Sequence, residues 1–376
     1  MTDATTRRRF LATATRSAAG AALAARAGGL AAAESGKKVT LALVGCAHIH
    51  TPGFVRLLNE WADVRVKWAW DEDPARVAKW GGALSAETAR SADVVFADPE
   101  VQGVIICSET NRHGALVASA ARAKKHMFVE KPLAATGPES RQMADAIEKA
   151  GVLFTTGYFM RTDPKHIILR EWVKKGAFGK ITRASAWNCH SGSLGGWFDE
   201  KPGNVAETWR WMADPKIAGV GAFGDMGTHS LDVLMWLLGD VESANADIRV
   251  VTGRYGDCDE TGTALLRFAG GFVATLSAGW VDIANPVTLQ IGGTEGHAVI
   301  VQDKLLFQSK QVPGSSLNAP VEDLPQGPKP PLRQFVDAVA GVGGQPLVTP
   351  REAAARVAVM EAAYASARTG LWTKVS

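Results

Sequence analysis

Three ionisable side chains stand where they could take part in proton transfer. Lys131 closely follows the apolar run Met127-Phe128-Val129, which is typical of a buried strand, so its amine is expected near a strand's carboxyl end. Asp225 and His229 are four residues apart and would share one face of a helix. Hydride transfer from a carbinol needs a base for the hydroxyl proton and a cation that favours the alkoxide. Taken singly, Lys131 could be a surface lysine and His229 a satisfied core histidine.

The elements around Lys131 alternate between strands and helices. Lys38 to Gly45 and Val64 to Trp70 have the apolar character of strands buried in a parallel sheet. Further strands are expected at Val94–Phe96, Val101–Cys107 and Met127–Val129, and helices over Phe54–Trp61 and Leu116–Lys124. This alternation predicts an N-terminal Rossmann domain over residues 38–156, a doubly wound parallel sheet with its ligand at the strand carboxyl ends.

The loop after the first strand has the position of a dinucleotide-binding loop but keeps only its first glycine. A G-x-G-x-x-G pattern would place glycines where this chain has Ala47 and His50. Asp71 ends the next strand, where a carboxylate accepts hydrogen bonds from ribose hydroxyls and repels a 2′-phosphate. We therefore expect NAD rather than NADP. The expected cofactor contacts in this part of the chain are Gly45, Ala47, His48, Ile49, His50 and Asp71.

His48 and His50 allow three interpretations. A His-x-His pair supplies ligands in many metal sites, but the two residues could also merely shape the turn. Thr51 is placed to cap the following helix, and Pro52 is tolerated only in its first turn. Both histidines would then lie in the loop and could donate to a pyrophosphate. We expect this last role and no metal ion.

Four ordered motifs carry a resemblance to a known family. They are Val104–His113, Phe128–Leu133 with its Glu-Lys-Pro segment, Gly157–Arg161, and Gly221–Asp232 with its Asp-x-x-x-His spacing. Together with the closing stretch Ala363–Gly370 they resemble the Gfo/Idh/MocA family of glucose–fructose oxidoreductase and inositol dehydrogenase. The resemblance implies that Lys131, Asp225 and His229 form the catalytic set, with histidine as the usual proton acceptor. It also implies that Glu130 holds the nicotinamide ribose, that Ser108 and His113 line the cofactor site, and that the bond before Pro132 is often cis.

The second part of the chain is rich in short strands. These are expected at Ala184–Cys189, Ala244–Val251, Gly262–Phe268, Val273–Ala278, Thr288–Gly292 and Ala298–Val301. They predict a C-terminal α+β domain over residues 157–376 with one open, mainly antiparallel sheet. The resemblance implies that a face of this sheet is buried against another subunit, giving a homodimer or homotetramer. Gly314 to Pro331 reads as an exposed loop.

Tryptophans lie close in sequence to the expected catalytic helix. Trp197 and Trp209-Arg210-Trp211 precede Asp225, and the C–H faces of sugars stack on indole rings. The same tryptophans could instead belong to the core or to a subunit interface. The expected substrate contacts, for a small carbohydrate, are Arg161, His190, Trp209 and Arg210.

The N-terminus has the pattern of an export signal. Thr6-Arg7-Arg8-Arg9-Phe10-Leu11 resembles a twin-arginine motif, and Ala31-Ala32-Ala33 could be its cleavage site, which predicts a signal peptide over residues 1–33 and a periplasmic protein. A helical N-terminal arm is the alternative. Residues 1–33 carry five arginines against one aspartate, and subtracting this +4 from the formal charge of +3 leaves −1. We expect neither nucleic-acid binding nor membrane association after export.

These features favour an exported oxidoreductase that transfers hydride to or from a sugar, polyol or glycoside. Export in the folded state predicts a tightly held nucleotide that is loaded before export. Two alternatives stay open. One is a redox-neutral enzyme that cleaves or epimerises a glycoside by transient oxidation, and the other is an inactive binding protein, which the missing glycines would favour.

Overall fold

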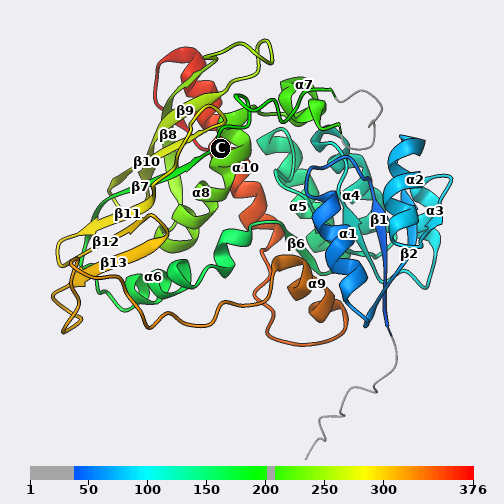
Figure 1. Cartoon of the computed structure of the whole chain (residues 1–376), viewed down its shortest axis with the longest axis horizontal. Helices are drawn as coiled ribbons and strands as arrows, with labels where there is room; N and C mark the ends of the chain where they lie inside the picture. The colour runs from blue at the N-terminus through cyan, green and yellow to red at the C-terminus, as the bar shows by residue number, and fades with distance from the viewer. Residues whose placement is uncertain (1–37, 201–207) are drawn as a thin grey trace, which may run out of the picture. The chain divides into compact units, whose positions relative to one another are not determined.

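A parallel sheet forms the first half of the protein in the computed structural model, which describes residues 38–200 and 208–376 (Figure 1). Its strands are β1 (Val39–Val44), β2 (Val64–Trp70), β3 (Glu87–Thr88), β4 (Gly103–Ile106), β5 (His126–Val129) and β6 (Phe154–Thr156). They pair side by side and all parallel in the order β3-β2-β1-β4-β5-β6. The chain reverses its direction of winding between β1 and β4, so a crevice for a ligand is expected at their carboxyl ends. The predicted Rossmann fold is confirmed.

Helices connect these strands. They are α1 (Thr51–Glu60), α2 (Pro74–Ala83), α3 (Ala92–Ala97), the 3₁₀ helix η1 (Thr110–Arg112), α4 (His113–Arg122) and α5 (Gly137–Ala150). Two expectations were wrong. Val94–Phe96 belongs to helix α3, because the Ser91 side chain caps the helix by accepting from the backbone N–H of Val94. Thr51 is the first residue of α1, and His50 occupies the capping position without a side-chain bond.

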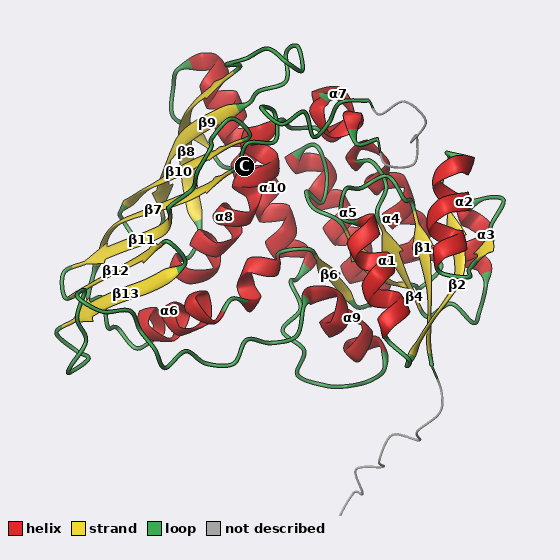
Figure 2. Cartoon of the chain, viewed as in Figure 1, coloured by secondary structure: helices red, strands yellow, loops and turns green. Residues whose placement is uncertain are grey.

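An eight-stranded sheet forms the second half (Figure 2). Its strands are β7 (Ile181–Cys189), β8 (Val241–Arg249), β9 (Thr261–Phe268), β10 (Val273–Gly279), β11 (Val287–Gly293), β12 (Gly296–Val301), β13 (Lys304–Ser309) and β14 (Thr373–Lys374). Their order is β13-β12-β11-β7-β10-β9-β8-β14, and the pair of β7 and β10 is parallel while the others are antiparallel. The open, mainly antiparallel sheet is confirmed, with β13 and β14 added to the strands expected from the sequence.

Helix α8 (Ala222–Leu238) packs on one face of this sheet. Phe223, Leu231 and Leu234 of the helix share a core with Ala264 and Leu266 of β9, which alternate with outward-facing residues along their strand. In Figure 2, α8 and helix α6 (Pro164–Lys174) lie on the same side of the strands. The sheet therefore holds α8, and with it Asp225 and His229, in a fixed position.

The chain returns to the first sheet near its end. Helix α9 (Pro331–Val339) inserts Leu332, Phe335 and Val336 into the core formed by residues such as Leu41 and Phe128. Helix α10 (Pro350–Thr369) then packs against both α5 and β8. Residues 38–376 accordingly form one unit, and part of the region expected to be a separate second domain completes the core of the first. The expected signal peptide, residues 1–33, lies outside the described residues.

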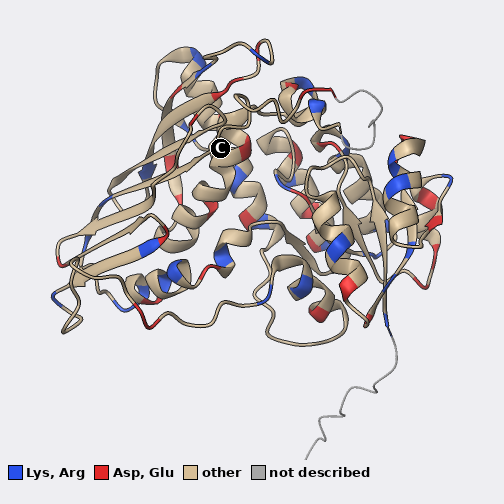
Figure 3. Cartoon of the chain, in the orientation of Figure 1, with Lys and Arg blue, Asp and Glu red and all other residues tan. Residues whose placement is uncertain are grey.

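Lys and Arg residues are interspersed with Asp and Glu residues along the elements of both halves (Figure 3). Among the described residues, no helix has the length and apolar character needed to cross a membrane.

The position of α9 leads to a stability prediction. Phe335→Ala removes a completely buried ring that contacts Phe128 edge-on, with ring centroids 6.2 Å apart, so we expect a loss of about 3–5 kcal/mol in the free energy of unfolding. Urea denaturation measures this loss. Val342→Ala, at a side chain that is 50% exposed, is the control and should cost less than about 0.5 kcal/mol. An equally small effect of Phe335→Ala would contradict the assignment of α9 to the first core.

Candidate active site

A buried ion pair joins the two halves at the carboxyl edge of the parallel sheet. Lys131 follows β5 closely, and its Nζ lies 2.6 Å from Oδ1 of Asp225 on α8. The peptide bond from Lys131 to Pro132 is cis, as the resemblance implied. The Lys131 side chain is 3% exposed and that of Asp225 is 13% exposed. Two residues that are 94 positions apart in the sequence thus meet, as the sequence analysis expected.

The second oxygen of Asp225 is also held. The indole N–H of Trp280, a fully buried residue that follows β10, donates to Oδ2 at 3.3 Å. Burial alone would raise the pKa of Asp225, but the charge and hydrogen bond of Lys131 outweigh it and lower this pKa to about 2. Asp225 is therefore a carboxylate at neutral pH, with both oxygens fixed.

His229 lies one helical turn beyond Asp225 on α8. Its ring is buried between Phe159 and Tyr158, with ring centroids 4.9 Å and 6.2 Å away. Burial and the charge of Lys131 hold its pKa well below the usual value, so the imidazole is neutral. The buried Nδ1 atom has no hydrogen-bond partner among the described residues. A neutral imidazole with an uncommitted nitrogen is suited to accept a proton from a bound hydroxyl.

Distant residues hold the beginning of α8. Gly221 provides no side-chain cap, so the first N–H groups need other partners. The Asp259 carboxylate accepts from the Phe223 N–H, and the Tyr364 hydroxyl accepts from the N–H groups of Gly221 and Gly224 while donating to Asp259. The helix turn that carries Asp225 is thereby tied to the end of the chain.

The loop after β1 is shaped by backbone bonds. Gly45 has a φ of +81°, and a Cβ atom there would lie 2.5 Å from the backbone nitrogen of Ser108, so a side chain cannot be accommodated. The N–H groups of Ala47 and His48 both donate to the Cys107 carbonyl at 3.0 Å. These two N–H groups are therefore bonded within the protein and are not available to a phosphate group.

Asp71 lies beside this loop as expected. Its carboxylate accepts from the N–H of Cys46 at 2.5 Å and from that of Asp73 at 2.8 Å, and burial raises its pKa. Arg76 approaches it at 3.5 Å but makes its shorter contact, 2.7 Å, with Glu109. The tight glycine turn and the carboxylate at the end of β2 fit the adenosine half of NAD.

Glu130 contacts both histidines of the loop after β1, His48 and His50, through its carboxylate. Its carboxylate is fully buried, with Oε1 lying 3.0 Å from Nδ1 of His50 and Oε2 lying 3.7 Å from Nε2 of His48. Burial lowers the pKa of His48 to about 3, so this imidazole is neutral. Burial opposes ionisation of Glu130, but its contacts with the two histidines prevail and lower its pKa. The sequence analysis placed these residues near the cofactor without placing them in contact with each other.

Other expected cofactor contacts have roles in positioning. Both ring nitrogens of His113 lie within hydrogen-bond distance of backbone carbonyls: Pro132 and Leu133 at 3.2 Å on one side, Ser108 at 3.3 Å on the other. Ser108 is buried and its hydroxyl donates to the Glu109 carbonyl. His113 therefore links the segment after Lys131 to the end of β4. Ile49 is partly buried and packs against an apolar cluster that includes Ala47 and Trp211.

Arg161 has structural partners instead of a place in a substrate pocket. Its guanidinium binds both oxygens of Asp232, at 2.6 Å and 2.8 Å, and also Glu352 at 2.8 Å. Arg356 donates to the same aspartate, so Asp232 has a structural role. With its charge satisfied in this way, Arg161 ties α8 to α10 rather than facing a ligand.

The remaining expected substrate residues lie around the tryptophans. The His190 ring stacks on Trp197 with centroids 4.6 Å apart, and its pKa is lowered first by burial and also by the charge of Lys131. The Arg210 guanidinium lies 4.8 Å from the ring centroid of Tyr255, and Trp209 packs against the neighbouring apolar cluster. The charges of Asp225 and Lys131 both act on the His190 ring.

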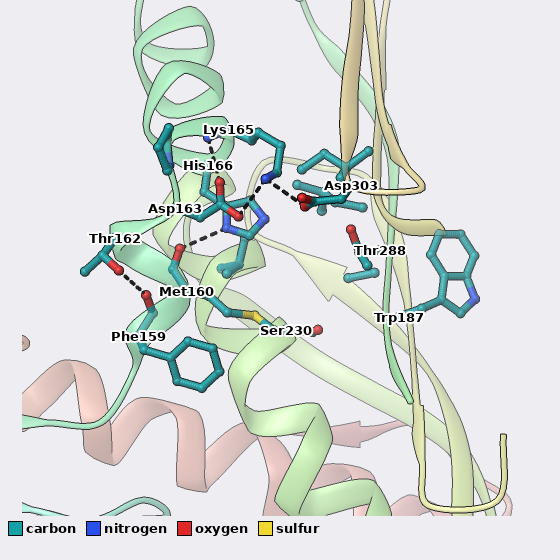
Figure 4. A pocket seen from close by; sticks show the side chains of 15 residues that line it. Phe159, Met160, Thr162, Asp163, Lys165, His166, Trp187, Ser230, Thr288 and Asp303 are labelled. Atoms are coloured by element: carbon teal, nitrogen blue, oxygen red, sulfur yellow. Dashed lines mark hydrogen bonds and ion pairs between the residues drawn. The ribbon is translucent and has the colours of Figure 1, made fainter. Parts of the chain in front are cut away.

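A cavity of about 380 Å³ is lined by Phe159 and by Ser230, the residue after His229 (Figure 4). Phe159 forms part of its wall, and its ring contacts that of His229 with ring centroids 4.9 Å apart. Its polar wall includes Ser230, Thr288, and Lys165 paired with Asp163 and Asp303. Lys131, Asp225 and His229 do not line this cavity, and the contact between the rings of Phe159 and His229 connects its wall to the site.

Sequence reasoning did not single out the two tryptophans that fix the site. Trp280 holds Asp225, and Trp211 donates its indole N–H to the Ala47 carbonyl of the cofactor loop at 2.9 Å. Trp211 belongs to the aromatic segment noted in the sequence, but no sequence signal indicated that it bonds to Ala47. Trp280 follows an ordinary alternating strand, so no sequence signal separates it from other core residues.

Comparison with known protein families decides the identity of the fold. Residues 39–158 match a family model described as an oxidoreductase family with an NAD-binding Rossmann fold, and residues 166–299 match a Gfo/Idh/MocA C-terminal domain. The chain belongs to the Gfo/Idh/MocA family. The cofactor of the family's Rossmann domain is NAD, as expected from Asp71.

Individual relatives support this assignment. Levoglucosan dehydrogenase of Pseudarthrobacter phenanthrenivorans is 29% identical, over 54% of this chain and 56% of its own. Myo-inositol 2-dehydrogenase of Thermotoga maritima is 33% identical, over 48% of this chain and 50% of its own. The matches thus span about half the length of these curated relatives.

Solved structures share the fold. A levoglucosan dehydrogenase in complex with NADH and levoglucosan has a TM-score of 0.73 at 22% identity, covering 90% of this chain and 100% of its own. The WlbA dehydrogenase of Bordetella pertussis in complex with NADH and UDP-GlcNAcA has a TM-score of 0.75 at 20% identity, covering 90% and 99%.

The Lys131–Asp225 pair predicts a pH dependence of stability. Because the folded-state pKa of Asp225 lies near 2, below its ordinary 3.8, its ionisation stabilises the fold above about pH 4, by about 2 kcal/mol, and this is lost as the pH falls toward 2. Asp225→Asn should therefore be less stable than wild type at pH 6, with a difference that shrinks below pH 4. Denaturant unfolding across this range measures it. Asp240→Asn, which removes an exposed carboxylate, is the control; a difference that stayed constant with pH would contradict the prediction.

Proposed function

We propose that this protein is an NAD-dependent oxidoreductase that acts on a CH–OH group of a sugar or polyol. The observation that carries the proposal is the neutral, buried His229 with an uncommitted Nδ1, one helical turn from the Lys131–Asp225 pair. All three residues lie at the carboxyl edge of a Rossmann sheet, where the fold places its ligands.

The three side chains divide the work of proton handling. His229 accepts the proton of the substrate hydroxyl at its free ring nitrogen. Lys131 supplies positive charge next to the oxygen that becomes negative, and Asp225 keeps the amine in place through its 2.6 Å contact. NAD, when bound, takes up or returns the hydride. Phe159 and Tyr158 pack around His229 and keep water from its ring.

The cavity beside His229 supports a carbohydrate substrate. Its volume of about 380 Å³ falls in the range of small-molecule sites. Phe159 offers an apolar ring, and Ser230 and Thr288 offer hydroxyl groups, a combination that suits the alternating C–H and O–H surface of a sugar. The relatives named for levoglucosan and myo-inositol point to the same substrate class.

Export and tight cofactor binding complete the proposal. The twin-arginine pattern at residues 7–9 supports transport of the folded protein to the periplasm. A nucleotide would have to be loaded before transport and retained afterwards. Ordered contacts at Gly45 and Asp71 support retention of its adenosine half.

A homo-oligomer is the further expectation. The face of the second sheet that points away from α8 carries Leu265 and Val273, which are 40% and 38% exposed, among threonine and serine residues. Burial of this face against a second copy of the chain would form a dimer or tetramer, and light scattering would determine which.

Two substitutions test the catalytic assignment. Lys131→Ala and His229→Ala should each lower kcat by at least about 100-fold, because each removes a group that meets the reacting oxygen. Steady-state kinetics with sugars and polyols, alongside circular dichroism to check folding, measures this. His297→Ala, at a histidine of β12 that contacts Gln290 and lies outside the cavity lining, is the matched control and should retain most of kcat. Near-normal turnover in either catalytic variant would remove that residue from the mechanism.

The nucleotide itself can be identified directly. Extensively dialysed protein should release close to one NAD per chain on acid denaturation, because Asp71 opposes the 2′-phosphate of NADP. Mass spectrometry of the released nucleotide is the measurement. Asp71→Ser should weaken retention of NAD and relax the preference. Recovery of mainly NADP would overturn the role of Asp71, and no nucleotide with no binding on titration would overturn the oxidoreductase assignment.

A further inference from the structure

The buried carboxylate of Glu130 has unusual partners. Its side chain is fully inaccessible, yet among the described residues its ion-pair contacts are with His48 and His50 rather than with a lysine or arginine. The neighbouring Lys131 amine is bonded to Asp225 instead. A buried carboxylate needs a compensating cation or a metal ion, since an isolated charge is costly to remove from water.

The histidines are poor sources of that positive charge. The side chain of His48 is 2% exposed, and a charged ring is costly to hold away from water. His50 is the partly exposed member of the cluster, with 35% of its side chain accessible. Two imidazoles and one carboxylate form a common ligand set for zinc and related first-row metal ions.

The three groups already converge. One ligand atom from each of His48, His50 and Glu130 lies within 4.8 Å of the other two. Metal–ligand bonds of about 2.0–2.2 Å would bring these atoms around one ion with side-chain movements of about 1 Å. The backbone is fixed on both sides, because the His48 N–H donates to Cys107 and the Glu130 N–H donates to Ile106.

We propose that His48, His50 and Glu130 bind one divalent transition-metal ion, such as Zn²⁺ or Co²⁺, beside Lys131. Coordination by Nε2 of His48 places the ring proton on Nδ1. The Nδ1 atom can then no longer accept the hydrogen bond that the His50 N–H donates to it at 3.2 Å, so this bond is lost. Nitrogen ligands favour these ions over Mg²⁺ and Ca²⁺, which prefer oxygen. Because the His50 side chain is partly exposed, water or another ligand can complete the coordination of the ion on that side.

Metal binding to the untagged full-length protein tests the site. After dialysis against a chelator, Co²⁺ should bind at one ion per chain, with a ligand-field absorption band that Zn²⁺ abolishes, and it should raise Tm. His50→Asn, at the half-exposed position, and Glu130→Gln should each weaken Co²⁺ binding by more than about 100-fold. Equilibrium dialysis with elemental analysis gives the stoichiometry and the Kd.

A histidine outside the cluster provides the control. His297→Asn, on β12, changes the same side chain at a site where it contacts Gln290, and should leave Co²⁺ binding unchanged. Wild-type protein that binds no more Co²⁺ or Zn²⁺ than His50→Asn overturns the proposal. So does full binding in a folded Glu130→Gln protein, since the ion would then lie elsewhere.

Discussion

The contact between Lys131 and Asp225 is the constraint on which the rest of the structure depends. It links the carboxyl end of a parallel strand to a helix held by an antiparallel sheet, and both partners are largely buried. A buried ion pair gains little net stability because desolvation opposes the attraction, so its geometry must be fixed from outside. Trp280 fixes one oxygen of Asp225, Asp259 and Tyr364 fix the start of α8, and His113 links the segment after Lys131 to the end of β4.

The same arrangement supports the role of base that we propose for His229. His229 lies one helical turn from Asp225 on α8. Because α8 packs on the second sheet, the His229 ring is held in an apolar environment beside Phe159. Burial and the nearby ammonium keep it neutral, and Asp225 keeps that ammonium in place. The charge of one residue thus sets the protonation of another, which is how a site gains reactive groups at neutral pH.

Sequence reasoning succeeded where local pattern decides structure. The apolar runs at β1, β2 and β5 are strands, and the spacing of Asp225 and His229 does place them on one helix. It failed at Val94–Phe96, where a three-residue apolar run carries no period and a serine cap decides for helix. It also missed α9 in the first core and Trp280 beside Asp225, because both depend on contacts between segments far apart in the chain. Arg161 was expected near the substrate, but two carboxylates that only the fold brings together satisfy its charge.

The loop after β1 departs from the glycine pattern of dinucleotide-binding loops, with Ala47 and His50 at two of its three glycine positions. The N–H groups of Ala47 and His48 are bonded to Cys107, and the two histidines converge on Glu130 instead of leaving an open glycine turn. Whether the site still performs hydride transfer is best tested in a single turnover. Protein loaded with NAD⁺ is mixed rapidly with sugars and polyols while the absorbance of reduced nicotinamide is followed. The account predicts that at least one of these compounds reduces the nucleotide bound to the wild-type protein. The same reduction should be at least about 100-fold slower in Asp225→Asn. Reduction at the same rate in both proteins would contradict it.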